Sequence, residues 1–254
     1  MSVTLVHPRP KFARARLTEP PPAGYLHLAA AVEPPPGGIG RPGHSRGKSH
    51  LLDLLRAEAE DLASLTEVKR ASVYRAAALA PAVGWDPPAG LHRARYDVVL
   101  LVETRTPRDI APARDSAAYR RLRRRLDHAA RDVHEMTARC AKCLADVDRG
   151  HQGLFQFTYF VAEDPRRTAE LWEHLAGWYA AETGLDNSVL LQPLDESASD
   201  YSFVAHARWD AGLAAVALRQ FTKPSFYRFL GPTLRENRTA AMPVLHHLVQ
   251  LRDR

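Results

Sequence analysis

Hydrophobic and polar residues follow two different periods along this chain, and the order of those periods predicts its fold. Apolar positions run together or alternate in segments typical of β-strands, and recur every third or fourth residue in segments typical of amphipathic helices. In the first half we expect strands over residues 25–32, 68–79, 96–104 and 137–147, and helices over 49–65, with Ser49 as N-cap, and over 113–134. The predicted order is strand, helix, strand, strand, helix, strand.

The same order returns in the second half. We expect strands over 154–161, 188–194, 201–209 and 242–251, a helix over 165–183 that stops at Gly184, and a helical stretch over 213–235 interrupted around Pro224. A short echo of sequence, residues 118–122 against 226–230, falls within the second helical stretch of each half. This coincidence of residues and element order indicates an internal repeat.

Two such units predict an α+β fold made of two tandem ferredoxin-like βαββαβ domains. Packing them sheet to sheet buries the bare face of each sheet and gives an intrachain pseudo-dimeric α+β barrel. We expect an N-terminal arm or strap over residues 1–22, a first domain over 23–150 with a loop insertion at 34–47, and a second domain over 151–254. Residues 34–47 are rich in proline and glycine, which favours a loop there.

Composition and charge narrow the functional classes. The 254 residues include no apolar run of about 20, so we expect no membrane span, and Pro8 and Pro10 interrupt the segment where a secretory signal would lie, which favours a cytoplasmic location. The formal charge is +6, but only five of the 35 basic residues are lysines. This arginine bias is typical of a GC-rich genome, and the basic cluster at 121–125 fits the solvated side of a helix, so we expect no nucleic-acid partner.

Three short motifs are interpreted as structural. Cys140 and Cys143 form a lone CxxC without further ligands nearby, so we expect neither a disulfide framework nor a metal site. The segment 43–49 resembles a phosphate-binding loop, but Pro42 stands where the first glycine is needed. The neighbouring His246 and His247 point to opposite faces of a strand and cannot chelate as a pair.

A group of motifs in the second half resembles a known family. They are Glu182-Thr183-Gly184-Leu185, Phe203-Val204, Ala207-Arg208-Trp209-Asp210, and Pro224-Ser225-Phe226 with Phe229. On these residues, about the last hundred of the chain are similar to the antibiotic biosynthesis monooxygenase family of the dimeric α+β barrel superfamily. The resemblance implies an oxidoreductase, a monooxygenase that converts anthrone-type aromatic polyketides to quinones without metal or flavin during antibiotic biosynthesis.

The resemblance also implies a set of site residues. Trp209 stands where the family has its functional tryptophan, whereas Ala205 replaces an asparagine that could stabilise an oxyanion or peroxide. His206 or His174 would be the base, although strand alternation points His206 away from Ala205 and Trp209. Arg208 would be an electrostatic stabiliser. The expected substrate-binding residues are Trp172, Tyr179, Phe203 and Tyr227, because flat aromatic rings stack well on aromatic side chains.

Several alternatives stay open at this point. The expected partners are a small aromatic substrate and dioxygen, and the chain would be a monomer, as a pseudo-dimer, or a homodimer. No cofactor is expected, with haem as the alternative, since relatives bind and cleave haem; residues 213–235 lack a histidine, while His128 and His134 lie on the corresponding helix of the first half. A polyketide cyclase or a non-catalytic barrel protein would fit the same fold.

Overall fold

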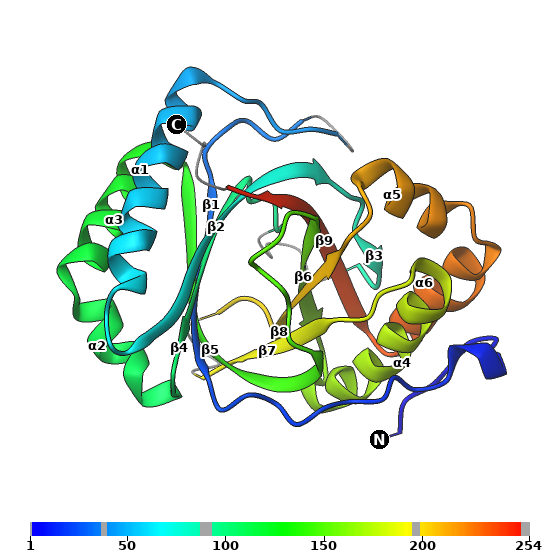
Figure 1. The fold of residues 1–254 in the computed structure, drawn as a ribbon. Coiled ribbons are helices and arrows are strands. Elements are labelled where there is room, and N and C mark those ends of the chain that lie inside the picture. The colour runs from blue at the N-terminus through cyan, green and yellow to red at the C-terminus, as the bar shows by residue number, and fades with distance from the viewer. Residues whose placement is uncertain (1, 37–39, 87–92, 195–198, 250–254) are drawn as a thin grey trace.

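Eight strands form one closed antiparallel barrel in the computed structural model, which describes residues 2–36, 40–86, 93–194 and 199–249. Helices lie outside the barrel in two layers, α1 to α3 on one side and α4 to α6 on the other (Figure 1). In the part of the chain that is described, no helix is long and apolar enough to cross a membrane.

The first half contributes one helical layer and four barrel strands in the ferredoxin-like order β2-β4-β1-β5. The short strand β3, absent from the expectation, lies between the expected strands 68–79 and 96–104 and pairs with β9 of the second half. The elements of the first half are β1 (Gly24–Ala31), α1 (Arg46–Ala63), β2 (Val68–Leu79), β3 (Val83–Gly84), β4 (Val98–Thr104), α2 (Ile110–Asp115), α3 (Ala117–Ala129) and β5 (Asp132–Ala145).

The second half repeats this arrangement with the corresponding strand order β7-β8-β6-β9. Its second helical stretch is divided into α5, a π-helical turn over Phe226–Leu230, and α6. Pro224 lies just before the turn, as a residue that interrupts helical hydrogen bonding should. The elements are β6 (Leu154–Ala162), α4 (Pro165–Thr183), β7 (Ser188–Pro193), β8 (Phe203–Trp209), α5 (Leu213–Phe221), α6 (Gly231–Glu236) and β9 (Thr239–Leu248).

The two sheets join at their edges, which goes further than the expected face-to-face packing. Strand β5 pairs with β7, with Cys140 opposite Leu191, and β2 pairs with β9, with Tyr74 opposite Leu248. Each edge strand of one half thus hydrogen-bonds to an edge strand of the other. Among the strands that the structure describes, closure pairs every barrel edge with another strand of the same chain.

Both faces of the barrel wall are buried, and they differ in character. Phe155, Phe157 and Tyr159 of β6 project into the interior, where side chains from both halves form one apolar cluster. The alternate residues Gln156 and Thr158 face outward toward the helical layer of the second half, as the two-residue period of a strand requires.

Helix boundaries in the first half differ from those expected. Helix α1 begins earlier because Ser45, not Ser49, is the N-cap and accepts a hydrogen bond from the Lys48 amide at 3.1 Å. The expected single helix over 113–134 breaks at Ser116, whose extended backbone caps α3 through the Tyr119 amide. His134 consequently lies on strand β5 and not on the helix.

The N-terminal residues 3–18 form a strap across the helices of the second half. Thr4 exchanges hydrogen bonds with the side-chain amide of Asn237, and the Thr18 amide donates to the Cys143 carbonyl. Between these ends, the Phe12 ring packs 5.1 Å from that of Phe229. The strap therefore belongs to the packed body of the molecule.

Candidate active site

A small cavity lies between the outer face of the second sheet and its helices. Its volume is about 50 Å³, room for a few water molecules. The wall is mainly apolar, with a few polar groups on the sheet side. The lining residues are Gln156, Thr158, Phe160, Trp172, Leu175, Ala176, Tyr179, Leu185, Ser188, Ala205, Ala207, Trp209, Leu230, Leu234 and Ala241.

Strand β8 brings Trp209 to the cavity, on the same face as Ala205 and Ala207. The indole Nε1 of Trp209 donates to the Thr183 hydroxyl at 3.0 Å, and its ring lies 6.1 Å from that of Tyr179 in an edge arrangement. Both tryptophans of the wall, Trp172 and Trp209, are almost fully buried. Three of the expected residues, Trp172, Tyr179 and Trp209, are thus together in one cavity.

The motifs at 182–185 and 224–226 hold this layer together. The Ser225 hydroxyl accepts from the Trp178 indole at 3.0 Å and donates to the Glu182 carboxylate at 3.2 Å. Lys11 of the strap and Lys223 pair with the same carboxylate. These contacts give Glu182 and Ser225 a structural role that joins α4, the strap and the approach to the π-helical turn.

Two polar residues of the cavity, Gln156 and Thr158, were not among those expected from the sequence. The Gln156 amide donates to the Thr158 hydroxyl at 2.7 Å. In the register of β6 and β8, Thr158 is opposite Ala205 and Gln156 is opposite Ala207. A side-chain amide is therefore present on the strand beside Ala205. The signal in the sequence was a polar residue at every second position of an otherwise aromatic strand.

Tyr179 adds a phenol hydroxyl to the polar side chains of the cavity. Burial raises the pKa of its phenol to about 12, and a hydrogen bond with Gln156 offsets part of that rise. The phenol is therefore protonated at neutral pH and can donate a hydrogen bond. Since none of the described lining residues is a carboxylate or an imidazole, the cavity wall that they form offers hydrogen-bond donors and apolar surface, but no base.

His206 and Arg208 lie on the opposite face of β8, inside the barrel. The His206 ring stacks on Phe157 at 4.3 Å, and its Nε2 lies 3.3 Å from the Tyr74 hydroxyl. Burial, followed by the charge of Arg149, holds the pKa of His206 well below its usual value. Arg208 donates to the Gln152 carbonyl and pairs with Asp210, both at 2.7 Å. The sheet separates both side chains from the cavity.

The other three expected residues also lie outside the cavity lining. His174 is half-buried on α4, where burial and then Arg14 of the strap lower its pKa. Phe203 is buried in the core between sheet and helices, and its partner across the strands is Phe160. Tyr227 is 60% exposed, and its hydroxyl donates to the Phe221 carbonyl. It therefore faces solvent, whereas Tyr119, the corresponding residue of the sequence echo, is buried.

The residues around this cavity do not fit a haem group. The described lining residues include no histidine, cysteine or methionine, and 50 Å³ is far below the ~300 Å³ or more of typical cofactor sites. In the first half, His128 is exposed on α3 and His134 lies on β5. No cluster of three or more metal-binding side chains occurs among the described residues.

Comparisons with known proteins agree on the architecture. No protein-family model and no curated protein sequence matches the chain. The structure of an anthrone oxidase-like protein superposes with a TM-score of 0.58 at 14% identity, covering 93% of this chain and 95% of the other. A candidate monooxygenase from Fusobacterium nucleatum gives a TM-score of 0.50 at 8% identity, covering 91% and 95%. The chain therefore shares the overall fold of these two proteins, and at these identities the likeness extends to the fold alone.

Proposed function

We propose that this protein is a cofactor-independent monooxygenase that oxidises a small anthrone-type aromatic to a quinone in polyketide or antibiotic biosynthesis. The observation that carries the proposal is the cavity between sheet and helices, which Trp172, Trp209 and Tyr179 line together with Gln156. Aromatic walls suit a flat substrate, and a few convergent donors would orient its oxygen atoms. The fold shared with an anthrone oxidase-like protein supports the same reaction class.

In the proposed reaction the substrate enters as its enolate, because no lining residue is a base at neutral pH. The Tyr179 hydroxyl and the Gln156 amide donate hydrogen bonds to the enolate oxygen. The electron-rich carbon forms a C–O bond to dioxygen and gives a peroxide anion, which takes up one proton from solvent; cleavage of the O–O bond and of the C–H bond at that carbon then expels water. Loss of one water molecule leaves the quinone carbonyl, so the substrate carbon is oxidised and one oxygen atom is reduced to water. Gln156 would take the place of the amide that is missing at position 205.

Substrate entry requires the cavity to enlarge. At about 50 Å³ it is smaller than the ~300 Å³ typical of ligand sites. Leu230 and Leu234 line it from the π-helical turn and α6, just beyond the break at Pro224. Displacement of this short segment would open the cavity without disturbing the barrel, since interrupted helices are less constrained than continuous ones.

The test is an assay with a dihydroxyanthrone, following oxygen uptake and quinone absorbance. We expect saturable turnover, and a fall in kcat/KM of roughly 10²- to 10³-fold in Gln156→Leu, the effect of losing one donor to a developing oxyanion. Gln192→Leu, a matched change at a half-buried β7 residue outside the cavity, should behave as wild type. Oxygen uptake no faster than the uncatalysed reaction would contradict the proposal.

A non-catalytic aromatic-binding barrel is the second candidate, favoured by the alanine at position 205. It predicts that the anthrone quenches the fluorescence of Trp209 and Trp172 in a saturable way while no oxygen is consumed. The two candidates are thus separated by running both measurements on one sample.

We further propose that the chain is an intrachain pseudo-dimer of two ferredoxin-like domains. Support comes from the equivalent strand orders β2-β4-β1-β5 and β7-β8-β6-β9. One chain would then supply the two sheets that single-domain relatives supply by dimerising, and only the second half would keep the proposed site.

A further inference from the structure

A second and larger cavity lies outside the barrel at the seam where β2 meets β9. Its volume is about 350 Å³, within the range of small-molecule sites. The lining comes from the loop before α1, the first turn of α1, the two seam strands and the start of α5. These elements belong to both halves of the chain (Figure 1). The lining residues are Arg41, Pro42, Gly43, His44, Lys48, Arg75, Ala76, Ala77, Leu213 and His247.

Arg75 and His247 meet across the seam. They are directly opposite in the register of β2 and β9, so their side chains share one face of the wall at close range. Their chain neighbours Tyr74 and His246 are fully buried in the interior, and alternation therefore turns Arg75 and His247 outward. Closure of the barrel, which joins residues 172 positions apart, creates this pair.

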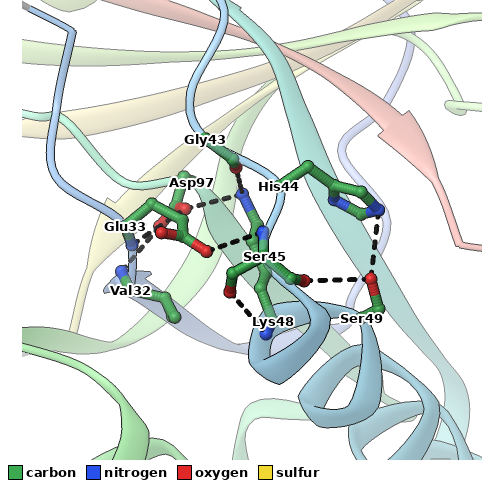
Figure 2. A network of polar contacts seen from close by, with 8 residues as sticks. All are labelled: Val32, Glu33, Gly43, His44, Ser45, Lys48, Ser49 and Asp97. Atoms are coloured by element: carbon green, nitrogen blue, oxygen red, sulfur yellow. Dashed lines mark hydrogen bonds and ion pairs between the residues drawn. The ribbon is translucent and has the colours of Figure 1, made fainter.

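A loop that is hydrogen-bonded at both ends supplies the other basic groups, Arg41 and His44. The Leu79 amide donates to the Gly40 carbonyl at 2.9 Å and ties the start of the loop to β2. At its other end, His44 lies 3.2 Å from the Ser49 hydroxyl on the first turns of α1 (Figure 2). Both ends of the segment are thus anchored to regular structure.

The centre of the loop is held by a buried ion pair, shown in Figure 2. The Lys48 ammonium lies 2.6 Å from the Asp97 carboxylate and also donates to the Gly43 carbonyl at 3.1 Å. Asp97 in turn accepts from the Val32 amide, and the Glu33 carboxylate accepts from the Ser45 amide. This network fixes the backbone that carries Arg41 and His44 toward the cavity.

Arg41 and Arg75 carry a charge in this cavity that no described carboxylate neutralises. None of its lining residues is acidic, and neither Arg41 nor Arg75 forms an ion pair with a described carboxylate. Elsewhere arginines do find partners: Arg121 and Arg125 on α3 both reach Glu58 of α1. Two unpaired guanidinium groups in one hollow create a local positive potential that attracts anions.

We propose that this seam cavity binds the oxyanion of a small molecule, a phosphate or a carboxylate group. Arginine presents planar, forked N–H donors that match both groups. The site differs from a phosphate-binding loop, because Lys48 is neutralised by Asp97 and the free charge comes from Arg41 and Arg75. The seam cavity and the proposed oxygenase cavity lie on different parts of the molecule. The proposal of an anion site therefore does not depend on the proposed oxygenase function.

Titration calorimetry at constant ionic strength tests the proposal, with inorganic phosphate and succinate as separate probes. We expect saturable binding of at least one probe, and at least about tenfold weaker binding in Arg75→Ala and Arg41→Ala, the effect of losing charged hydrogen bonds. The control is Arg124→Ala, which removes the same charge from an exposed position on α3. Thermal unfolding without a probe verifies that each variant folds.

Each outcome decides the proposal. Binding of phosphate alone or of succinate alone, lost in the two seam variants and kept in the control, supports it and identifies the preferred oxyanion. Absence of saturable binding by both probes overturns it. Equal weakening in Arg124→Ala also overturns it, because the anions would then respond only to net charge.

Discussion

At the residue scale, the unusual feature is a set of histidines sealed inside the barrel. His27, His206 and His246 are each at most 1% exposed, and burial is the main cause that lowers the pKa of all three. The interior hydrogen bonds they make are to neutral groups, such as Tyr159 for His27 and the Val244 carbonyl for His246. Neutral imidazoles are therefore part of the packed core, and protonating them is costly.

This predicts a dependence of stability on pH. The pKa of His246 is lowered to about 3, so below pH ~6.5 the unfolded chain binds a proton that the folded chain does not. The contribution of the neutral His246 to the free energy of unfolding is fully present above pH ~6.5. It is lost as pH falls toward 3, at up to about 1.4 kcal/mol per pH unit.

Denaturant unfolding between pH 7 and 4 measures the effect. The slope of unfolding free energy against pH should become shallower in His246→Gln by up to the amount that corresponds to one bound proton. This change in slope does not depend on the absolute stability of the variant. The matched change at an exposed residue, His50→Gln, should leave the slope as in wild type. An unchanged slope in His246→Gln would show that this imidazole is not buried in its neutral form.

At the element scale, helix α4 connects three features. One side of it lines the cavity through Trp172 and Tyr179, its C-terminal end holds Glu182, and its outer side receives the strap. Contact with the strap is close at Gly177, where a Cβ would lie only 1.9 Å from the Ala13 carbonyl oxygen. A glycine in the middle of this helix costs stability by itself, and the strap gives the physical reason for it.

We therefore predict that Gly177→Ala loosens the strap. The added methyl group should cost roughly 1–3 kcal/mol, the range for overpacking a filled contact, and make residues 3–18 more sensitive to protease. Limited proteolysis and denaturant unfolding measure the two effects. Gly47→Ala, whose Cβ would have 3.7 Å of clearance early in α1, should be neutral or slightly stabilising. Wild-type behaviour of Gly177→Ala would contradict the close contact.

At the scale of the whole molecule, the barrel interior is a joint product of the two halves. Its apolar cluster includes Tyr25 and Tyr74 from the first half and Phe155 and Phe157 from the second. Both seams are continuous strand pairings, β5 with β7 and β2 with β9. Separating the halves would expose one large aromatic face and two unpaired edges on each.

The corresponding prediction concerns the isolated halves, residues 1–150, which keep the strap, and 151–254. Expressed alone, each should aggregate or self-associate, because a monomer cannot bury its inner sheet face. Co-expression of the two should restore a 1:1 complex with cooperative thermal unfolding. Size-exclusion chromatography with light scattering gives the masses. A stable, cooperatively folded monomer of either half would show that the interior is not shared as described.

The sequence by itself determined the local features. The hydrophobic periods revealed which segments are strands and which are helices, and the two strand orders are built from these elements. Helix α4 ends at Gly184 as expected, because the backbone of that residue is left-handed. Alternation along β8 correctly separated the face of Trp209 and Ala205 from that of His206. These features depend on neighbours within a few residues, which is why one chain segment suffices to predict them.

Only the tertiary structure decided which of these side chains meet. Gln156 and Thr158 entered the site because β6 pairs with β8, and Arg75 met His247 because β2 pairs with β9. Tyr227 was left in solvent by the π-helical turn although its sequence echo, Tyr119, is buried. Such outcomes depend on contacts between segments far apart in the chain, whose free energies arise from packing and closure and leave no local period in the sequence.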